Sequence, residues 1–416
     1  MPENTAAMPS NTVDAILPNG LRFVGERIER SQALALAMRI PAGSKDDPAN
    51  KLGLASLVHE TLYKGTRKRD ARALEDAFDF YGIQHSEQTL TESTILQLRC
   101  LPEHAAKALE LLREVLSEPS FPEKECETAK TMAVQSLKRL DDEPLSKVFV
   151  LLKELFFGSE WGHVELGSLA TVPEVSRCDI EAFWKAHYIP AGVVVSAAGQ
   201  FDPEALQKEL ETLLANSGPA WPQENPPPPP DKHLRQHSYK DSQQTQIAMA
   251  YPAVPRNHPA YYTARVAVGV LSGGMSARLF TEVREKRGLV YAVGAQAISL
   301  RGAGAVYAYA GTTAPRAAET LQVLKAELAR LGQDVTQEEI DRAKVGQKSR
   351  MLMDQESTYH RAREMLDDVF YEGRVVPASE IVQKIDAVTL DDVKTYWNSH
   401  PVEPYSLVIL GREALE

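Results

Sequence analysis

The second half of this sequence repeats the first half in the same order. Met38 and Pro41 recur 211 positions later as Met249 and Pro252, and the offset drifts by only a few residues afterwards. A collinear series of this kind is hard to produce by chance, so the repeat predicts two related domains with a common core. Further matched pairs are Ala105 and Ala317, Leu109 and Leu321, Asp179 and Asp392, Trp184 and Trp397, and His187 and His400.

The composition is that of a globular protein and excludes several functions. With 416 residues, 43% of them hydrophobic and 25% charged, each half can bury a core of its own. A net charge of -11 argues against nucleic acid as a partner. The three cysteines (Cys100, Cys126 and Cys178) are scattered and predict no disulfide framework.

The sequence also allows a prediction about membrane association and location in the cell. No apolar run approaches the roughly 18 residues of a membrane span, so no membrane partner is expected. The first dozen residues lack the plan of a signal peptide. We therefore expect a cytoplasmic protein, or a periplasmic one if a signal peptide has been removed from a precursor.

Each half predicts the same series of elements, namely a strand, an apolar helix, a second strand, a long amphipathic helix and a final strand. Strands and helices mix without regular βαβ alternation, which favours an α+β fold. We expect two tandem homologous domains, each a mainly antiparallel sheet with helices packed on one face. The predicted series covers residues 33–40, 52–63, 93–100, 105–116 and 193–198 in the first half, and 245–251, 262–271, 305–311, 317–328 and 406–410 in the second.

The domain boundaries follow from the repeat and from one proline-rich stretch. Five consecutive prolines, residues 226–230, cannot enter a helix or a central strand and favour a stiff linker. We predict a disordered tail at 1–14, a first domain at 15–217, a linker at 218–236 and a second domain at 237–416.

One motif in the first half is nearly a metal site. Residues 52–66 read LGLASLVHETLYKGT and resemble the metal-binding helix of the M16 zinc proteases (insulinase, pitrilysin and mitochondrial processing peptidase). In that family H-x-x-E-H places two histidines on one helix face to share a zinc ion, with the glutamate as general base. Here Ser56 replaces the first histidine, His59 the glutamate and Glu60 the second histidine.

The third zinc ligand of the family is also missing. Residues 121–144 resemble the later helix that carries the ligand glutamate, and spacing back from Pro144 puts that position on Ser136, with Ala129 two turns earlier. Neither side chain can replace a carboxylate, so we expect no metal in this chain. A shifted site that combines His59 with Glu60 or His85 stays open, although no spacing supports it.

The motif in the second half is intact. Residues 271–291 resemble the most recognisable stretch of the M16 C-terminal repeat, where an arginine and a tyrosine stand seven residues apart, as Arg284 and Tyr291 do here. The resemblance implies that they hold the substrate carbonyl oxygen and stabilise its developing charge. By spacing alone Arg284 could be a surface charge and Tyr291 a residue packed on the sheet. Arg278 and Arg287 are expected to face solvent or form salt bridges.

Taken together, the two motifs imply a catalytically incomplete subunit. The resemblance is to M16 heterodimers in which one subunit binds zinc through H-x-x-E-H and the other contributes the arginine–tyrosine pair. It implies a fold of the LuxS and processing-peptidase metallohydrolase type, zinc in the partner subunit, and unfolded peptide as substrate. The alternatives are a non-enzymatic scaffold, as in the core subunits of the bc1 complex, and a peptide-binding homodimer.

Overall fold

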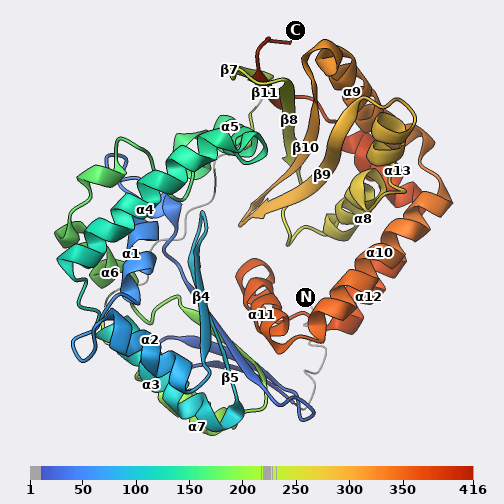
Figure 1. Ribbon diagram of the computed structural model, residues 1–416. Helices are drawn as coiled ribbons and strands as arrows, with labels where there is room; N and C mark the ends of the chain where they lie inside the picture. Colours follow the sequence, from blue (N-terminus) through green and yellow to red (C-terminus); the bar gives the residue numbers. More distant parts are fainter. Residues whose placement is uncertain (1–10, 217, 219–225, 227, 231, 416) are drawn as a thin grey trace. The chain divides into compact units, whose positions relative to one another are not determined.

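The computed structural model describes residues 11–216, 218, 226, 228–230 and 232–415 (Figure 1). The first ten residues of the predicted tail and much of the predicted linker lie outside this range. The predicted linker was too long at its end, because residues 234–236 belong to a strand that pairs with residues 406–408. The described residues form two compact units. Unit 1 holds those of Met1–Ser136, Glu165–Gln223 and Asp354–Val375, and unit 2 those of Leu137–Val164, Glu224–Met353 and Val376–Glu416.

Unit 1 is built on a sheet of six strands in the order β1-β2-β6-β3-β5-β4. All neighbours are antiparallel except β2 and β6, which run parallel. Thr12 pairs with Glu26, so the predicted disordered tail was too long: residues 12–14 belong to a strand because β2 offers its edge to them. The strands are β1 (Thr12–Ile16), β2 (Arg22–Arg27), β3 (Leu34–Ile40), β4 (Gln84–Thr89), β5 (Thr94–Cys100) and β6 (Val194–Gly199).

Unit 2 is built on a sheet of five strands in the order β7-β11-β8-β10-β9, again with a single parallel pair, β11 and β7. Both sheets place the first long strand of the repeat beside the last one, β3 beside β6 and β8 beside β11. The α+β class and the mainly antiparallel sheets are confirmed. The strands are β7 (Leu234–Tyr239), β8 (Gln244–Ala253), β9 (Val290–Leu300), β10 (Ala303–Thr313) and β11 (Ser406–Gly411).

Helices of the same repeat cover one face of each sheet. In unit 2, Ile247, Met249 and Tyr251 of β8 face a core shared with α8, α9 and α13. Among the described residues no helix is long and apolar enough to span a bilayer. The first repeat contains α1 (Leu54–Leu62), α2 (Ala71–Phe80), α3 (Ala105–Ser117), α4 (Glu123–Asp142), α5 (Pro144–Gly162), α6 (Arg177–His187) and α7 (Pro203–Leu210). The second contains α8 (Tyr261–Ser272), α9 (Ala317–Asp334), α10 (Gln337–Gln355), α11 (Thr358–Glu372), α12 (Ala378–Ala387) and α13 (Leu390–Ser399).

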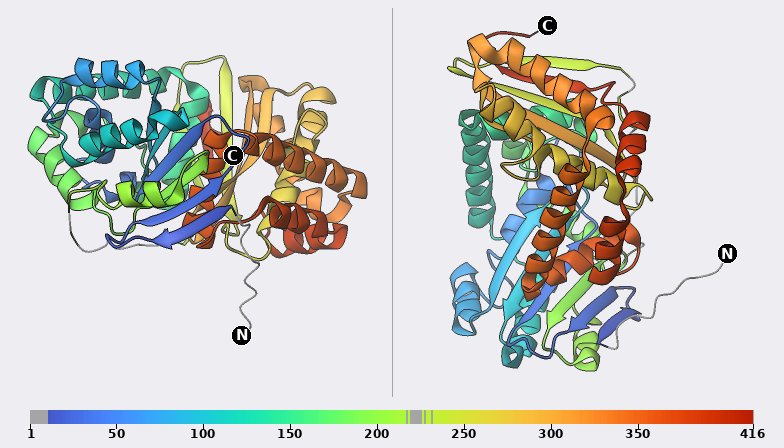
Figure 2. Two further views of the ribbon diagram at one scale, coloured as in Figure 1. Left: turned by 90° about the horizontal axis from the view of Figure 1, so that it is seen from below. Right: turned by 90° about the vertical axis from the view of Figure 1, so that its right-hand side faces the viewer.

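The expectation of helices on one face only was incomplete, because a helix from the opposite half of the sequence covers the other face of each sheet. In unit 2, Ala248 and Ala250 of β8 face the opposite way from Met249 and pack against α5, which lies across the sheet from α8 and α9 (Figure 1). In unit 1, α11 lies against the sheet in the same manner (Figure 2). Strands buried on both faces are rich in apolar residues, and in β3 all seven residues are buried and all but Arg39 are apolar.

Polar contacts also hold α11 in unit 1. Arg39 of β3 is buried, lies 4.2 Å from the centroid of the Phe370 ring, donates to Ser93 and pairs with Asp367 of α11. Arg361 of α11 pairs with Glu26 of β2 at 2.7 Å. Breaking a buried ion pair is costly because it leaves one charge without its partner. Each compact unit thus includes one helix from the other repeat. The predicted domains 15–217 and 237–416 therefore differ from the units, because residues 137–164 pack in unit 2 and residues 354–375 in unit 1.

The packing of α11 on the sheet of unit 1 can be tested at Leu366, which is fully buried there. We predict that Leu366→Ala lowers the free energy of unfolding by about 2–5 kcal/mol, through lost burial and a residual cavity. Urea unfolding followed by tryptophan fluorescence measures it. Leu352→Ala on α10, where the side chain is 49% exposed, is the control and should shift the midpoint little. Equal shifts in the two variants would contradict the packing of α11.

Candidate functional site

Helix α1 carries the first motif, and its start is held tightly. The carboxylate of Asp47 accepts hydrogen bonds from the backbone N–H groups of Gly53 and Ala55, both at 2.7 Å. Gly53 has φ of 98°, a left-handed conformation that favours glycine, and a Cβ there would lie 2.6 Å from the carbonyl oxygen of Leu166. The frame that positions a metal-binding helix is therefore built in full.

The side chains at the metal positions make other contacts. Ser56 is buried, and its hydroxyl donates to the carbonyl oxygen of Glu165 at 2.6 Å. Nδ1 of His59 lies 2.7 Å from the hydroxyl of Thr89, at the end of edge strand β4, and Nε2 lies 3.4 Å from a carboxylate oxygen of Glu60. Both ring nitrogens of His59 thus have partners within the protein.

These residues do not fit a zinc ion. Ser136 is half-buried on α4, and Ala129 on the same helix is buried and has no donor atom. Nowhere in the described part of the chain do three or more histidine, cysteine, aspartate or glutamate side chains gather as metal ligands would. Zinc needs three or four such donors, so we derive no chemistry from a metal in this chain.

His85 makes contacts of its own and shares none with His59. Its ring stacks on Tyr63 with centroids 4.3 Å apart, Nδ1 lies 2.6 Å from Glu87, and Nε2 lies 3.3 Å from Glu75 of α2. Burial lowers the pKa of His85, but the hydrogen bonds to Glu87 and Glu75 outweigh it, and the pKa is raised. The charged form of His85 therefore ties edge strand β4 to α2.

The second motif forms a π-helical turn, Phe280–Glu285, that leads directly into β9. Val283 of the turn and Leu289, just before β9, are both buried. The N–H of Leu289 donates to the carbonyl of Val283 at 3.1 Å. These contacts anchor the turn and leave Arg284 on its outside, over the ring of Phe280 at 4.7 Å. Within the described residues no carboxylate pairs with Arg284.

Tyr291 is the second residue of β9, and 61% of it is exposed. Tyr291 therefore does not pack on the sheet, although spacing alone allowed that alternative. Seven residues apart, Arg284 near the end of the π-helical turn and Tyr291 near the start of β9 are both exposed. Donors that are exposed and not already paired with a carboxylate are available to a ligand.

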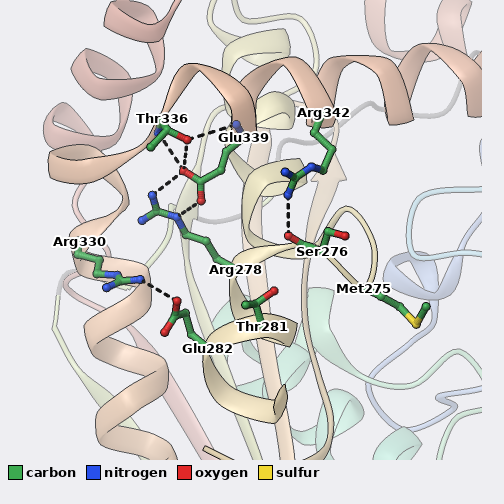
Figure 3. A pocket seen from close by; sticks show the side chains of 9 residues that line it. All are labelled: Met275, Ser276, Arg278, Thr281, Glu282, Arg330, Thr336, Glu339 and Arg342. Atoms are coloured by element: carbon green, nitrogen blue, oxygen red, sulfur yellow. Dashed lines mark hydrogen bonds and ion pairs between the residues drawn. The ribbon is translucent and has the colours of Figure 1, made fainter. Parts of the chain in front are cut away.

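Arg278 and Arg287, in contrast, form salt bridges as predicted. Arg278 is buried beside a cavity of about 410 Å³ and holds Glu339 with two hydrogen bonds of 2.6 and 2.8 Å (Figure 3). Burial raises the pKa of Glu339, but the bonds from Arg278 outweigh it and lower that pKa to about 2. Arg287 pairs with Glu282 at 3.0 Å. These charges neutralise one another and support the turn.

Both sequence motifs border an edge strand, which the sequence analysis did not anticipate. Thr89, the partner of His59, ends β4, and Tyr291 stands near the start of β9. Each of these strands has a neighbour on one side only. The eleven residues of β9 include no charged residue and no proline, the usual protections of an exposed edge. Such a strand is suited to pair with another extended chain.

Comparisons with known proteins agree with the motifs. Residues 22–160 match the family described as insulinase (peptidase family M16), and residues 174–346 match the peptidase M16 inactive domain. A protein of Bacillus subtilis named uncharacterized zinc protease YmxG is 27% identical over 398 residues, 94% of this chain and 96% of that protein. An uncharacterized zinc protease of Rickettsia felis is 26% identical, covering 91% of this chain and 92% of its own.

Solved structures show the same fold. A peptidase M16 inactive domain from Pseudomonas fluorescens superposes with a TM-score of 0.90 at 23% identity, over 98% of this chain and 99% of its own. A protease from Helicobacter pylori gives 0.87 at 19% identity, over 96% and 99%. A chain of Complex III2 from Candida albicans gives 0.82 at 18% identity, over 96% of each chain.

The degenerate donor set generates a prediction about metal. We expect the purified full chain to hold far less than one zinc ion per molecule, because Ser56 and Ser136 offer no zinc-binding side chain. Elemental analysis after dialysis measures the content, and the unfolding midpoint should be the same with and without a chelator. Stoichiometric zinc that survives dialysis would contradict this reading of the first motif.

The contacts of His85 generate a prediction about pH. Since the folded pKa lies above the unfolded value, the stabilisation by His85 is complete below the unfolded pKa and is lost as pH rises through the folded pKa. We predict that His85→Gln destabilises the protein more at pH 5.5 than at pH 9, measured as the difference in unfolding midpoint from wild type. His360→Gln, at an exposed position, is the control. A His85→Gln effect independent of pH would refute the bridging role.

Proposed function

Because this chain belongs to the M16 (insulinase) family of peptidases, we propose that it is the catalytically incomplete subunit of an M16-type zinc endopeptidase. Its partner would be a second M16 subunit with an intact H-x-x-E-H motif, which supplies the zinc and activates the water that attacks the peptide bond. The observation that carries the proposal is the contrast between the two motifs. Ser56 and His59 are engaged by neighbours within the protein, whereas Arg284 and Tyr291 are exposed.

The exposed pair suits the stabilisation of a developing negative charge. A guanidinium presents several N–H donors in a fixed fork, and a tyrosine hydroxyl adds one directed donor. As water attacks a peptide carbonyl, its oxygen gains charge, and donors held in place beforehand lower the barrier. The buried anchors Val283 and Leu289 hold Arg284 in place. Tyr291 stands at a β-bulge and is held by its neighbours, Val290 paired with Thr312 and Ala292 paired with Gly311.

The substrate we propose is an unfolded peptide bound in extended form. An edge strand offers a row of backbone N–H and C=O groups, and pairing with them recognises backbone rather than sequence. Strands β4 and β9 both end their sheets, and each adjoins one of the two motifs. Most backbone groups of a folded protein are already hydrogen-bonded within it, so unfolded segments would be preferred.

Reconstitution with a zinc-bearing partner tests the proposed function. We expect the purified chain alone to hydrolyse no peptide and the mixture to be active. Arg284→Ala or Tyr291→Phe in this chain should then lower turnover about 10²- to 10³-fold, as loss of one oxyanion donor does elsewhere. The measurement is hydrolysis of a quenched fluorescent peptide at saturating partner.

Two matched variants control for general damage to unit 2. Arg412→Ala removes a half-exposed arginine paired with Asp241, and Tyr239→Phe alters a tyrosine that is 70% exposed on β7. Both should leave turnover unchanged. If Arg284→Ala and Tyr291→Phe also leave turnover unchanged, the proposed role of the pair is wrong, and a scaffold role becomes the better account.

A further inference from the structure

A polar cavity of about 330 Å³ opens beside edge strand β4, on the face covered by α11. Ser86 and Gln88 of β4, Gln97 of β5, and Tyr359 and Arg363 of α11 line it. The hydroxyls of Ser86 and Tyr359 bond each other at 2.8 Å, which joins the edge strand to the helix. No feature of the two motifs involves this cavity, and it lies within unit 1 alone.

The cavity and the first motif lie on opposite faces of β4, because side chains alternate between the two faces of a strand. Ser86 pairs with Gln97 and Gln88 with Ile95, so these side chains share the face toward α11. His85 and Thr89 point to the opposite face, where His59 lies. A peptide paired with β4 would therefore present alternate side chains to His59 on one face and to the cavity on the other.

The charges around the cavity are unbalanced toward positive. Arg363 lies 3.3 Å from Asp367, but the same carboxylate also pairs with the buried Arg39. Asp367 is thus shared by two guanidinium groups, of which Arg39 also interacts with the carboxylate of Glu92. Arg99 of β5 adds a third positive charge 5.7 Å from the Tyr359 ring centroid. Glu87 borders the cavity too, but its carboxylate lies 2.6 Å from His85 on the opposite face.

We propose that this cavity accepts an acidic side chain of an extended peptide paired with β4, and that Arg363 determines this preference. A carboxylate there would take N–H donors from Arg363 and from the amides of Gln88 and Gln97. The inference rests on the proposed peptide-binding function and adds a substrate class to it. Arg363 lies on α11, a helix of the second repeat that packs on the sheet of the first repeat. The second repeat would therefore help to select the peptide that pairs with that sheet.

Binding of matched peptides to the full chain tests the inference. The probes are fluorescent, strand-forming peptides with both ends blocked and one central glutamate, glutamine or lysine, followed by anisotropy. We expect the glutamate peptide to bind about 3- to 10-fold more tightly than the glutamine peptide, as one partly buried charge pair allows. Arg363→Gln should remove this preference, Arg363→Lys should keep part of it, and Arg363→Glu should transfer it to the lysine peptide.

Arg72→Gln is the control, because Arg72 is a highly exposed arginine on α2 and should leave the preference unchanged. Equal binding of the glutamate and glutamine peptides to the wild-type chain would overturn the inference while the peptide-binding function stands. A glutamine peptide with a free carboxyl end that outcompetes the blocked glutamate peptide would show a site for chain termini instead. If no peptide binds at all, the proposed function itself fails.

Discussion

The structure depends on covering two apolar faces of each sheet. A repeat of about half this chain supplies helices for one face of its own sheet, and the second face must be removed from water as well. Helices α5 and α11 meet this need by packing on the sheet of the other half's unit. The alternate residues of β8, Met249 toward its own helices and Ala250 toward α5, show both faces in use within one strand. Neither repeat alone could bury its sheet in this way.

In the first motif the backbone geometry is present, although the side chains that would bind zinc are absent. Asp47 and Gly53 still fix the start of α1, although Ser56 now satisfies a backbone carbonyl and His59 bonds a threonine. The backbone at Gly53 is constrained by its close approach to Leu166, a contact that involves none of the metal positions. The π-helical turn keeps both its anchors and its exposed arginine and tyrosine. What remains is the frame of a peptidase M16 domain without zinc-binding side chains at the motif positions.

Much of the fold followed from sequence patterns. Alternation and helical spacing located β3, β8, α3 and α9 to within a few residues, because their apolar periodicity is strong. The repeat pairs Trp184 with Trp397, and in the structure both are buried and both donate to a backbone carbonyl, of Leu116 and Leu328. The start of β1 was missed because its five residues show no comparable pattern and its pairing with β2 decides the structure.

By itself the sequence determined the duplication, the α+β class, the loss of zinc-binding side chains at Ser56 and Ser136, and the presence of the Arg284–Tyr291 pair. These are properties of residue identity and spacing, and they can be recognised without knowing which distant residues are in contact. The tertiary structure alone decided which sheet α5 and α11 cover, that Tyr291 is exposed, and that Arg363 lies beside β4. Such facts depend on contacts between elements far apart in the sequence, as between α5 and β8 or between Ser86 and Tyr359, and no local pattern encodes them.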